Sequence, residues 1–250
     1  MRWLAGVLVL VQSGAWAVEP DPVIEAGLAA ERRHEPWAAL EYFQAAGRAR
    51  PDDAFIQQKI AQQLSDAAFL EPDPKERARL AATALPYAQR AVTLDPLSAV
   101  ACLSLSVLYG KLAVGSEVRT KIEYASRIRQ HAEEAMKLDP GYAWAWHVLG
   151  RWHVELSQVG MAQRALATVF FGGVPKASMA EGVRLLEGAV RLEPDAVAHQ
   201  VELGFAYLQA GRKREARERW ERAQTLPSIT IYDDAAKDRA RLGIIELTRG

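Results

Sequence analysis

The segment Trp146–Glu155 (WHVLGRWHVE) places a glycine in the middle of a helical pattern. Its first tryptophan, leucine, glycine and second histidine are spaced at i, i+3, i+4 and i+7, so they share one face of a helix. A glycine inside a helix costs about 1 kcal/mol relative to alanine, so Gly150 on this face predicts that a neighbouring helix approaches closely. Pro140 and Pro194, in Leu-Asp-Pro and Leu-Glu-Pro motifs, end the flanking helices and bracket one predicted helical hairpin.

The same unit recurs along the whole chain. Prolines follow helical segments at positions 51, 96, 140, 194 and 227, with spacings of 45, 44, 54 and 33 residues. A small residue that allows tight helix packing stands four or five positions before each proline: Ala46, Ala91, Ala135, Ala189 and Ala223. The W-x2-L-G-x2-Y pattern, with His153 in the tyrosine position, is typical of tetratricopeptide repeats. The sequence therefore predicts an all-α fold, a right-handed α-solenoid of about five tetratricopeptide helical hairpins.

Three spacings exceed the length of an undecorated repeat, so the middle units are predicted to carry insertions of about 11, 10 and 20 residues. The longest includes residues 160–174 (GMAQRALATVFFGGV), in which Met161, Ala165, Leu166, Val169 and Phe170 share a helical face. Two placements are open for this insertion, a lid over a groove or an additional core helix. The last stretch, Tyr232–Leu247, is predicted to be a C-terminal capping helix that covers the final hairpin.

The first residues predict an export signal rather than part of the fold. A short positive start precedes the apolar run Leu4–Val11, and Ala15-Trp16-Ala17 matches a cleavage site. We therefore expect a signal peptide at residues 1–17, a repeat domain at residues 18–250, and export to a bacterial periplasm. The apolar run is too short for a stable transmembrane helix, so we expect no integral membrane segment after cleavage. The alternative is that the signal stays uncleaved as an anchor.

Composition limits the class of function. Lysine and arginine total 31, as do aspartate and glutamate, so the chain has no net charge that would attract nucleic acid. The single cysteine, Cys102, forms neither an internal disulfide framework nor a multi-cysteine zinc site. The sequence contains no H-E-x-x-H motif, no G-x-S-x-G motif and no phosphate-binding glycine loop. We therefore predict a protein that is not an enzyme and that uses no metal, no cofactor and no nucleic-acid partner.

The candidate binding site is the concave face that the first helices of the hairpins would line. Equivalent positions in successive first helices give a mostly apolar face with a polar centre. The predicted groove residues are Phe55, Gln58, Gln62, Leu103, Val107, Trp144, His147, Arg151, Val201 and Phe205. Such a face suits an amphipathic helix, an extended apolar peptide or an acyl chain. The alternative is that the insertions fold back and fill the groove.

Arg151 is the only charged residue of this predicted groove, with histidine taken as neutral, and His147 lies one turn before it. Apolar neighbours favour a charge-assisted hydrogen bond from Arg151 to a carboxylate or phosphate of a ligand. The alternative is an ion pair with Glu155, four residues further along the same helix. Some tetratricopeptide proteins bind a C-terminal carboxylate with lysine and asparagine at equivalent positions. Here those positions hold Gln58, Gln62, Leu103 and Val107, so we do not expect that mode.

Several blocks of the chain resemble the regulator of microtubule dynamics family. They are Ser104–Tyr109 with Lys111, the Lys121-Ile122 region, Trp146–Ser157, Glu215–Pro227 and the long insertion that ends in Val174–Ser178. The resemblance covers roughly Leu80 to Leu247, and it implies an α-solenoid adaptor without enzymatic activity. It also implies lipid binding or transfer, which is associated with one tethering member. This chain departs from the family at its N-terminus, where an export signal replaces membrane or organelle segments.

Two functions are compatible with these features. The first is a non-catalytic scaffold or adaptor that binds a protein or peptide through the concave groove. The second is a carrier that holds a lipid or another apolar ligand under the 160–174 insertion. Phospholipid that co-purifies with the protein would favour the carrier, whereas a specific protein partner would favour the adaptor.

Overall fold

The computed structural model describes residues 21–249, with the backbone alone at positions 162, 163, 166, 170 and 171. The predicted signal peptide and its cleavage site lie outside the described residues, so both remain predictions. The described chain forms twelve helices and contains no strand. The helices are α1 (Pro22–Arg32), α2 (Pro36–Ala49), α3 (Ala54–Leu70), α4 (Pro74–Leu94), α5 (Ala99–Ala113), α6 (Val118–Leu138), α7 (Ala143–Ser157), α8 (Met161–Phe171), α9 (Met179–Leu192), α10 (Val197–Gln209), α11 (Lys213–Thr225) and α12 (Asp233–Arg249).

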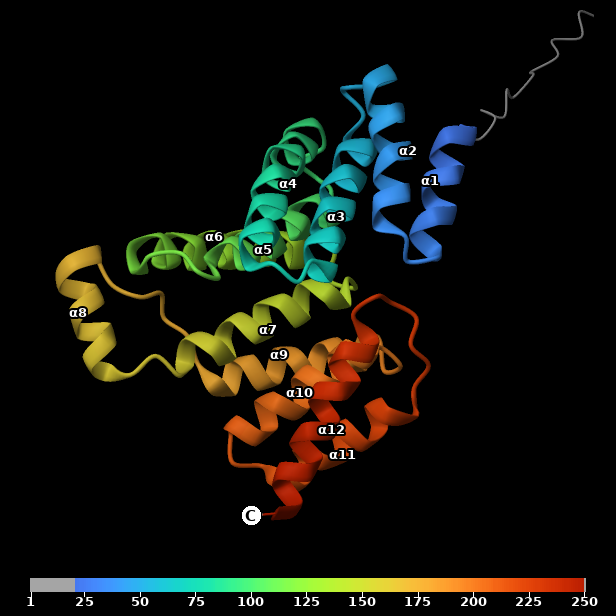
Figure 1. Ribbon diagram of the computed structural model, residues 1–250. Helices are drawn as coiled ribbons and strands as arrows, with labels where there is room; N and C mark the ends of the chain where they lie inside the picture. The colour runs from blue at the N-terminus through green and yellow to red at the C-terminus, as the bar shows by residue number, and fades with distance from the viewer. Residues whose placement is uncertain (1–20, 250) are drawn as a thin grey trace, which may run out of the picture.

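Ten of these helices pair into five hairpins, α1–α2, α3–α4, α5–α6, α7–α9 and α10–α11, and α12 packs on α10 and α11 (Figure 1). The first helices α3, α5, α7 and α10 also contact one another in order, and α12 continues this row. They form the inner layer of the molecule, while α4, α6, α9 and α11 form the outer layer. The arrangement confirms the predicted all-α solenoid of five hairpins, with α12 as its C-terminal cap.

The turns between successive helices follow from residues that start helices. Asp53 stands directly before α3, and its carboxylate accepts a hydrogen bond from the backbone N–H of Ile56 at 3.2 Å. Asp73 caps α4 in the same way, through the N–H of Lys75 at 3.0 Å. Each carboxylate satisfies an N–H group that has no partner within its own helix. Aspartates beside the prolines therefore fix where these helices begin.

Two of the three predicted insertions are longer outer helices. Helices α4 and α6 each contain 21 residues, whereas α9 and α11 contain 14 and 13. The extra length is about two helical turns, and it accounts for the proline spacings of 45 and 44 residues in this part of the chain. These residues extend the outer layer and do not fold back over the inner one.

The third insertion forms α8, which stands apart from the other helices at the left of Figure 1. It makes no extensive contact with another described helix. Met161 is 89% exposed and Val169 is 75% exposed, so the interpretation as an additional core helix is wrong. Nor does α8 cover the inner layer as a lid. It is tied to the end of α7 by Arg164, whose guanidinium donates hydrogen bonds to the carbonyls of Leu156 and Val159.

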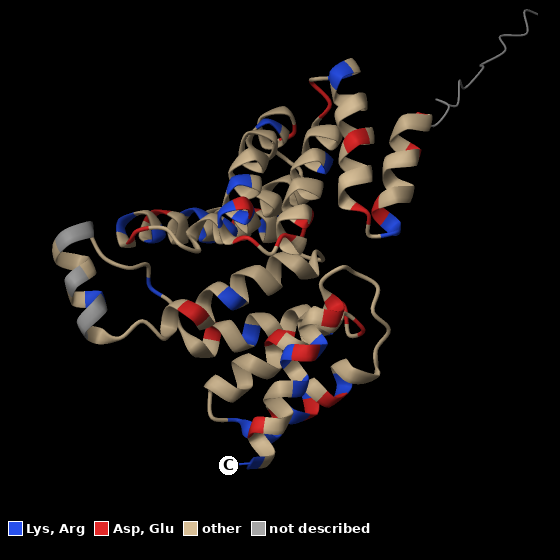
Figure 2. Ribbon diagram, viewed as in Figure 1, with Lys and Arg blue, Asp and Glu red and all other residues tan. Residues whose placement is uncertain are grey.

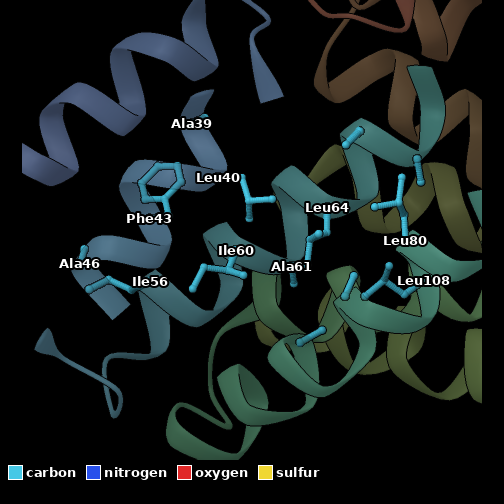
Figure 3. Packing of buried hydrophobic residues seen from close by; sticks show 14 of the residues in the cluster. Ala39, Leu40, Phe43, Ala46, Ile56, Ile60, Ala61, Leu64, Leu80 and Leu108 are labelled. Carbon is cyan, nitrogen blue, oxygen red and sulfur yellow. The ribbon is translucent and has the colours of Figure 1, made fainter. Parts of the chain in front are cut away.

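The hydrophobic core continues from hairpin to hairpin. Figure 3 shows its side chains running from Phe43 in α2 and Ile56 in α3 to Leu80 in α4 and Leu108 in α5. A Cβ on Gly27 would lie 2.9 Å from the ring of Phe43, so this glycine allows α1 and α2 to pack closely. The five alanines predicted to allow tight packing are all buried: Ala46, Ala91, Ala135, Ala189 and Ala223.

Charges of both signs are mixed along the outer helices, as Figure 2 shows for α6 and α11. Arg129 pairs with Glu133 at 2.7 Å on α6, and Arg217 pairs with Glu221 at 2.8 Å on α11. The arginine-rich stretch of α11 is therefore a solvated helix face and not a basic patch. Within residues 21–249, no helix has both the length and the apolar character that a membrane span requires.

The connection between α11 and α12 returns to the first hairpins. The Nε2 atom of His34 lies 3.1 Å from the carbonyl oxygen of Ile229, and the hydroxyl of Tyr232 donates a hydrogen bond to the carboxylate of Asp66. These partners are 195 and 166 residues apart in the sequence. The two ends of the solenoid are thus joined across its inner layer, a closure that the repeat pattern does not predict.

Candidate functional site

All ten predicted groove residues lie on the inner layer, but they do not form one open surface. Gln58, Leu103, His147 and Val201 are buried between neighbouring first helices. Phe55 is exposed, and Gln62, Val107, Trp144 and Phe205 are half-buried. Part of the predicted groove is therefore core, because the first helices pack directly on one another. The binding role of the set remains a prediction.

Polar side chains link α1, α3 and α5 on this layer. Lys59 Nζ donates to the two carboxylate oxygens of Glu31 at 2.8 and 2.9 Å. The side-chain amide of Gln62 accepts from Lys59 at 3.3 Å and donates to Glu31 at 3.0 Å. Gln58 donates to Gln62 and to the hydroxyl of Ser104, each at 3.3 Å. In this structure the two glutamines of the predicted groove hold neighbouring hairpins together.

Trp144, His147 and His199 form an aromatic cluster between α7 and α10. The ring centroid of Trp144 lies 5.1 Å from that of His147 and 4.7 Å from that of His199. The Nδ1 atoms of the two histidines are 2.9 Å apart, so one of them carries the shared proton and the other accepts it. Burial lowers the pKa of His147 well below its ordinary value and lowers the pKa of His199 to about 4. Both imidazoles are therefore neutral at pH 7.

This cluster is not a metal site. Two histidines supply two ligands, and no group of three or more His, Cys, Asp or Glu side chains within the described chain is placed to hold a metal ion. The Nε2 atom of His199 lies 3.4 Å from a carboxylate oxygen of Glu193. The position of these side chains thus matches a packed interface between two hairpins.

A cavity of about 130 Å³ lies next to this cluster, between α7, α9, α10 and α12. It has an apolar floor and a charged rim, and its lining comprises Arg151, Val154, Glu155, Leu186, Glu202, Phe205, Ala206, Gln209 and Arg239. The side chain of Glu202 is only 12% exposed and pairs with two arginines, Arg239 at 2.8 Å and Arg151 at 3.4 Å. The guanidinium of Arg239 also lies 4.7 Å from the ring centroid of Phe205.

Arg151 makes the ion pair that the sequence offered as an alternative to ligand binding. Its guanidinium donates to Glu155 at 2.8 Å, and the two side chains are 44% and 59% exposed. Exposed pairs of this kind contribute about 0–1 kcal/mol to stability, so an anionic group of a ligand can compete with Glu155. Because a guanidinium has five N–H donors, Arg151 can keep its contact with Glu202 while it binds such a group.

The sequence pattern missed three residues that define the geometry here. Glu202 follows Val201 directly, but the equivalent positions that defined the predicted groove lie on one helical face and leave Glu202 out. Arg239 lies in the capping helix, which the template does not cover. The third residue is His199. It contacts His147 from a different hairpin, 52 positions further along the chain, and the periodicity of a single helix cannot indicate such a contact.

Comparison with known proteins identifies the family. The family model described as Regulator of microtubule dynamics protein 1-3 matches residues 25–244. The chain belongs to this family. The match starts within α1, so the similarity reaches beyond the region from Leu80 onward that the sequence blocks indicated, and it includes the first two hairpins.

Two relatives show the extent of this similarity. The chain is 28% identical over 189 residues to Regulator of microtubule dynamics protein 3 of Rattus norvegicus, which covers 75% of this chain and 40% of that protein. It is 26% identical over 235 residues to Regulator of microtubule dynamics protein 1 of Bos taurus, with 93% of this chain and 73% of the relative covered. The chain therefore spans less than half of the rat relative.

Solved structures confirm the fold. The tetratricopeptide protein TTC0263 of Thermus thermophilus superposes with a TM-score of 0.66 at 19% identity, over 89% of this chain and 97% of that one. MamA from Desulfovibrio magneticus RS-1 gives a TM-score of 0.52 at 16% identity, over 82% and 92% of the two chains. At these identities the similarity establishes the helical solenoid and leaves the ligand open.

Proposed function

We propose that this protein is a non-catalytic binding scaffold that takes a segment of a partner protein onto its inner layer. The contact point is the cavity between α7, α9, α10 and α12. The observation that carries the proposal is the combination of an apolar floor with two arginines at the rim. The tetratricopeptide fold supports a protein-binding role in general, and the family model matches this chain along most of its length.

The cavity is suited to one side chain of the partner. Its volume of about 130 Å³ is well below the roughly 300–1,000 Å³ of typical small-molecule sites. Val154, Leu186 and Phe205 offer apolar contact to an aliphatic side chain. Arg151 and Arg239 stand beside it to pair with a carboxylate of the same segment. We therefore expect a partner segment in which an aliphatic residue neighbours an acidic one.

A site-specific photo-cross-linker tests this proposal. It replaces Gln209 at the cavity rim in one variant and Thr83, an exposed residue of α4, in the control variant. We expect the Gln209 variant to form an adduct with a defined partner in the producing cells, and the Thr83 variant to form none. The Gln209 adduct should weaken when Phe205→Ala removes part of the floor. The same adducts at both positions would contradict the proposal.

The lipid carrier is the second candidate, and the cavities favour it less. Besides the small cavity at Arg151, a depression of about 470 Å³ lies along α6 and against Pro175, and its lining is mostly charged or polar. Such a lining does not suit an acyl chain. Helix α8, under which the ligand was expected, stands apart from the inner layer. Organic extraction of the purified protein followed by mass spectrometry tests this second function. A lipid carrier should release a stoichiometric amount of bound lipid.

We further propose that the protein is exported and begins at Val18 after cleavage. The support is the apolar run that precedes Ala15-Trp16-Ala17. N-terminal sequencing of protein recovered from the periplasmic fraction should start at Val18. Recovery of protein that begins at Met1 would contradict cleavage and leave the segment as an anchor.

A further inference from the structure

The segment 227–232, between α11 and α12, contacts α3 and α5 of the inner layer through its last residue. Its last residue, Tyr232, points its ring at Phe69 of α3, with ring centroids 4.4 Å apart. The hydroxyl of Tyr232 donates a hydrogen bond to the carboxylate of Asp66, also on α3. From α5, the Nζ atom of Lys111 lies 5.7 Å from the centroid of the Tyr232 ring. Three side chains from two hairpins thus surround one tyrosine.

These three residues, Asp66, Phe69 and Lys111, are here called the tyrosine slot. Lys111 is fixed within it because its Nζ donates to the carbonyl oxygen of Ser65 at 2.6 Å. Burial raises the pKa of Asp66 to about 6 and lowers the pKa of Lys111 to about 8. Both groups therefore carry poorly solvated charges at pH 7, and each gains from contact with a polar or aromatic ligand group.

The rest of the segment is organised by its own turn and not by the slot. The backbone N–H groups of Ile229 and Thr230 both donate to Asp233 Oδ2 at 2.8 Å. Ile229 is 65% exposed, although its carbonyl oxygen meets His34. Tyr232 is therefore the residue through which this segment contacts α3 and α5. The backbone turn of the segment is stabilised by its hydrogen bonds to Asp233, which do not involve the slot.

We propose that the tyrosine slot recognises a tyrosine side chain of a partner peptide, and that Tyr232 occupies it as an internal ligand in the unbound protein. The slot uses residues separate from the cavity at Arg151, so the two proposals stand or fall independently. A partner that carries a tyrosine would displace the 227–232 segment and open the closure between the two ends of the solenoid.

The chemistry of the slot favours tyrosine over other side chains. A phenylalanine would stack on Phe69 but would leave the desolvated carboxylate of Asp66 without a donor from the ligand. A lysine or arginine of the ligand would be repelled by the positive charge of Lys111. A tyrosine suits all three side chains of the slot. Its ring packs against Phe69, its hydroxyl donates to Asp66, and its π-face meets the ammonium group of Lys111.

The proposal is tested by removing Tyr232 from the slot and then adding a peptide that carries a tyrosine. Tyr232→Ala removes the internal ligand, and Tyr124→Ala, a change to a half-buried tyrosine of α6, is the matched control. The probe is a fluorescent nine-residue peptide with the sequence of residues 226–234 (LPSITIYDD). We expect it to bind Tyr232→Ala at least about tenfold more tightly than wild type or the control, since a charge-assisted hydrogen bond contributes about 1.5–3 kcal/mol. A peptide with alanine in place of tyrosine should not bind. Equal affinity for wild type and Tyr232→Ala would overturn the proposal.

The reactivity of Lys111 gives a second measurement, which uses a more conservative variant. Tyr232→Phe keeps the aromatic ring, so it preserves the fold even if Tyr232→Ala does not. Without the hydroxyl, the segment should leave the slot more often and expose Lys111 to an acylating reagent. Mass spectrometry should then find Lys111 labelled up to about tenfold faster than in wild type, with the exposed Lys213 as an internal reference. An unchanged ratio of Lys111 to Lys213 labelling would overturn the internal-ligand role.

Discussion

Gly150 in α7 and Gly182 in α9 face each other where the two helices of the fourth hairpin cross. A Cβ on Gly150 would lie 3.1 Å from the carbonyl oxygen of Gly182, and a Cβ on Gly182 would lie 2.9 Å from that of Gly150. Leu186 and Val154 close the contact, at 2.8 and 2.6 Å from the two Cβ positions. Backbone meets backbone here, so neither helix has room for a side chain at this point.

Gly150→Leu is therefore expected to destabilise the protein. Overpacking of a tight core contact costs about 1–3 kcal/mol, and the rigid backbone of α9 cannot move aside as a flexible side chain would. Gly110→Ala in α5 is the control, because its Cβ would meet only Ile128 at 4.0 Å. The control should be neutral or stabilising by up to about 1 kcal/mol. Urea denaturation measures both variants, and a Gly150→Leu variant as stable as wild type would contradict the role of this contact.

Much of this hairpin could be predicted from sequence because its signals are local. The helical spacing around Gly150, the prolines that end helices and the buried alanines each arise within one or two turns of chain. The lengths of the insertions were also predictable, but their secondary structure was not. A proline spacing does not distinguish a longer outer helix such as α4 from an irregular loop.

The candidate sites were less predictable because they depend on pairs of distant residues. The template selected Leu103 and Val201 as groove residues, yet close packing between adjacent first helices buries them. The contacts of Asp66 with Tyr232 and of His147 with His199 join different hairpins. Their formation depends on the superhelical geometry, which a repeat period does not specify.

The carboxyl of Asp66 should make stability fall as the pH rises from 4 to 6. Burial raises its pKa from 3.8 to about 6, the hydrogen bond from Tyr232 and the charges of Lys111 and Lys59 oppose this shift, and Glu31 reinforces it. The folded state therefore binds a proton more tightly than the unfolded chain, and this stabilisation is lost once the folded carboxyl ionises. Asp66→Asn still accepts the hydrogen bond of Tyr232 but does not titrate. The free energy of unfolding of wild type minus that of Asp66→Asn should drop by up to about 3 kcal/mol between pH 4 and 7. A constant difference across that range would show that the carboxyl is not desolvated.

The histidine pair should act in the opposite direction. Burial is the main cause that lowers both folded pKa values, that of His199 to about 4. His199, Arg151 and Arg239 lower the pKa of His147 further, whereas Asp233 opposes the shift of His199. The unfolded chain takes up protons near pH 6.5, so stability is present above that pH and falls as the pH drops towards 4. Replacing both histidines by phenylalanine keeps two aromatic rings against Trp144. We expect this double variant to have nearly wild-type stability at pH 7.

The same double variant should lose less stability than wild type between pH 6.5 and 4.5. Denaturant titrations at several pH values provide the measurement, with each protein referenced to its own value at pH 7. His34→Asn is the control, since it removes an exposed histidine outside the cluster and asparagine tolerates the positive φ of 60° at this position. Parallel pH profiles for wild type and the double variant would contradict a buried neutral pair.

Arg151→Ala separates a ligand anchor from a structural ion pair. Glu202 keeps its contact with Arg239 at 2.8 Å in this variant, and the pair with Glu155 is exposed, so stability should change by no more than about 1 kcal/mol. If Arg151 binds a carboxylate of the partner, loss of the guanidinium should weaken binding by about 2–5 kcal/mol, the cost of removing one member of a buried charge pair. Arg184→Ala on α9 is the control, because Arg184 also forms an exposed pair, with Glu181 at 2.6 Å, but lies outside the cavity. Isothermal titration with the segment cross-linked at Gln209 measures all three proteins. Equal affinities for wild type, Arg151→Ala and Arg184→Ala would leave Arg151 as a purely structural residue.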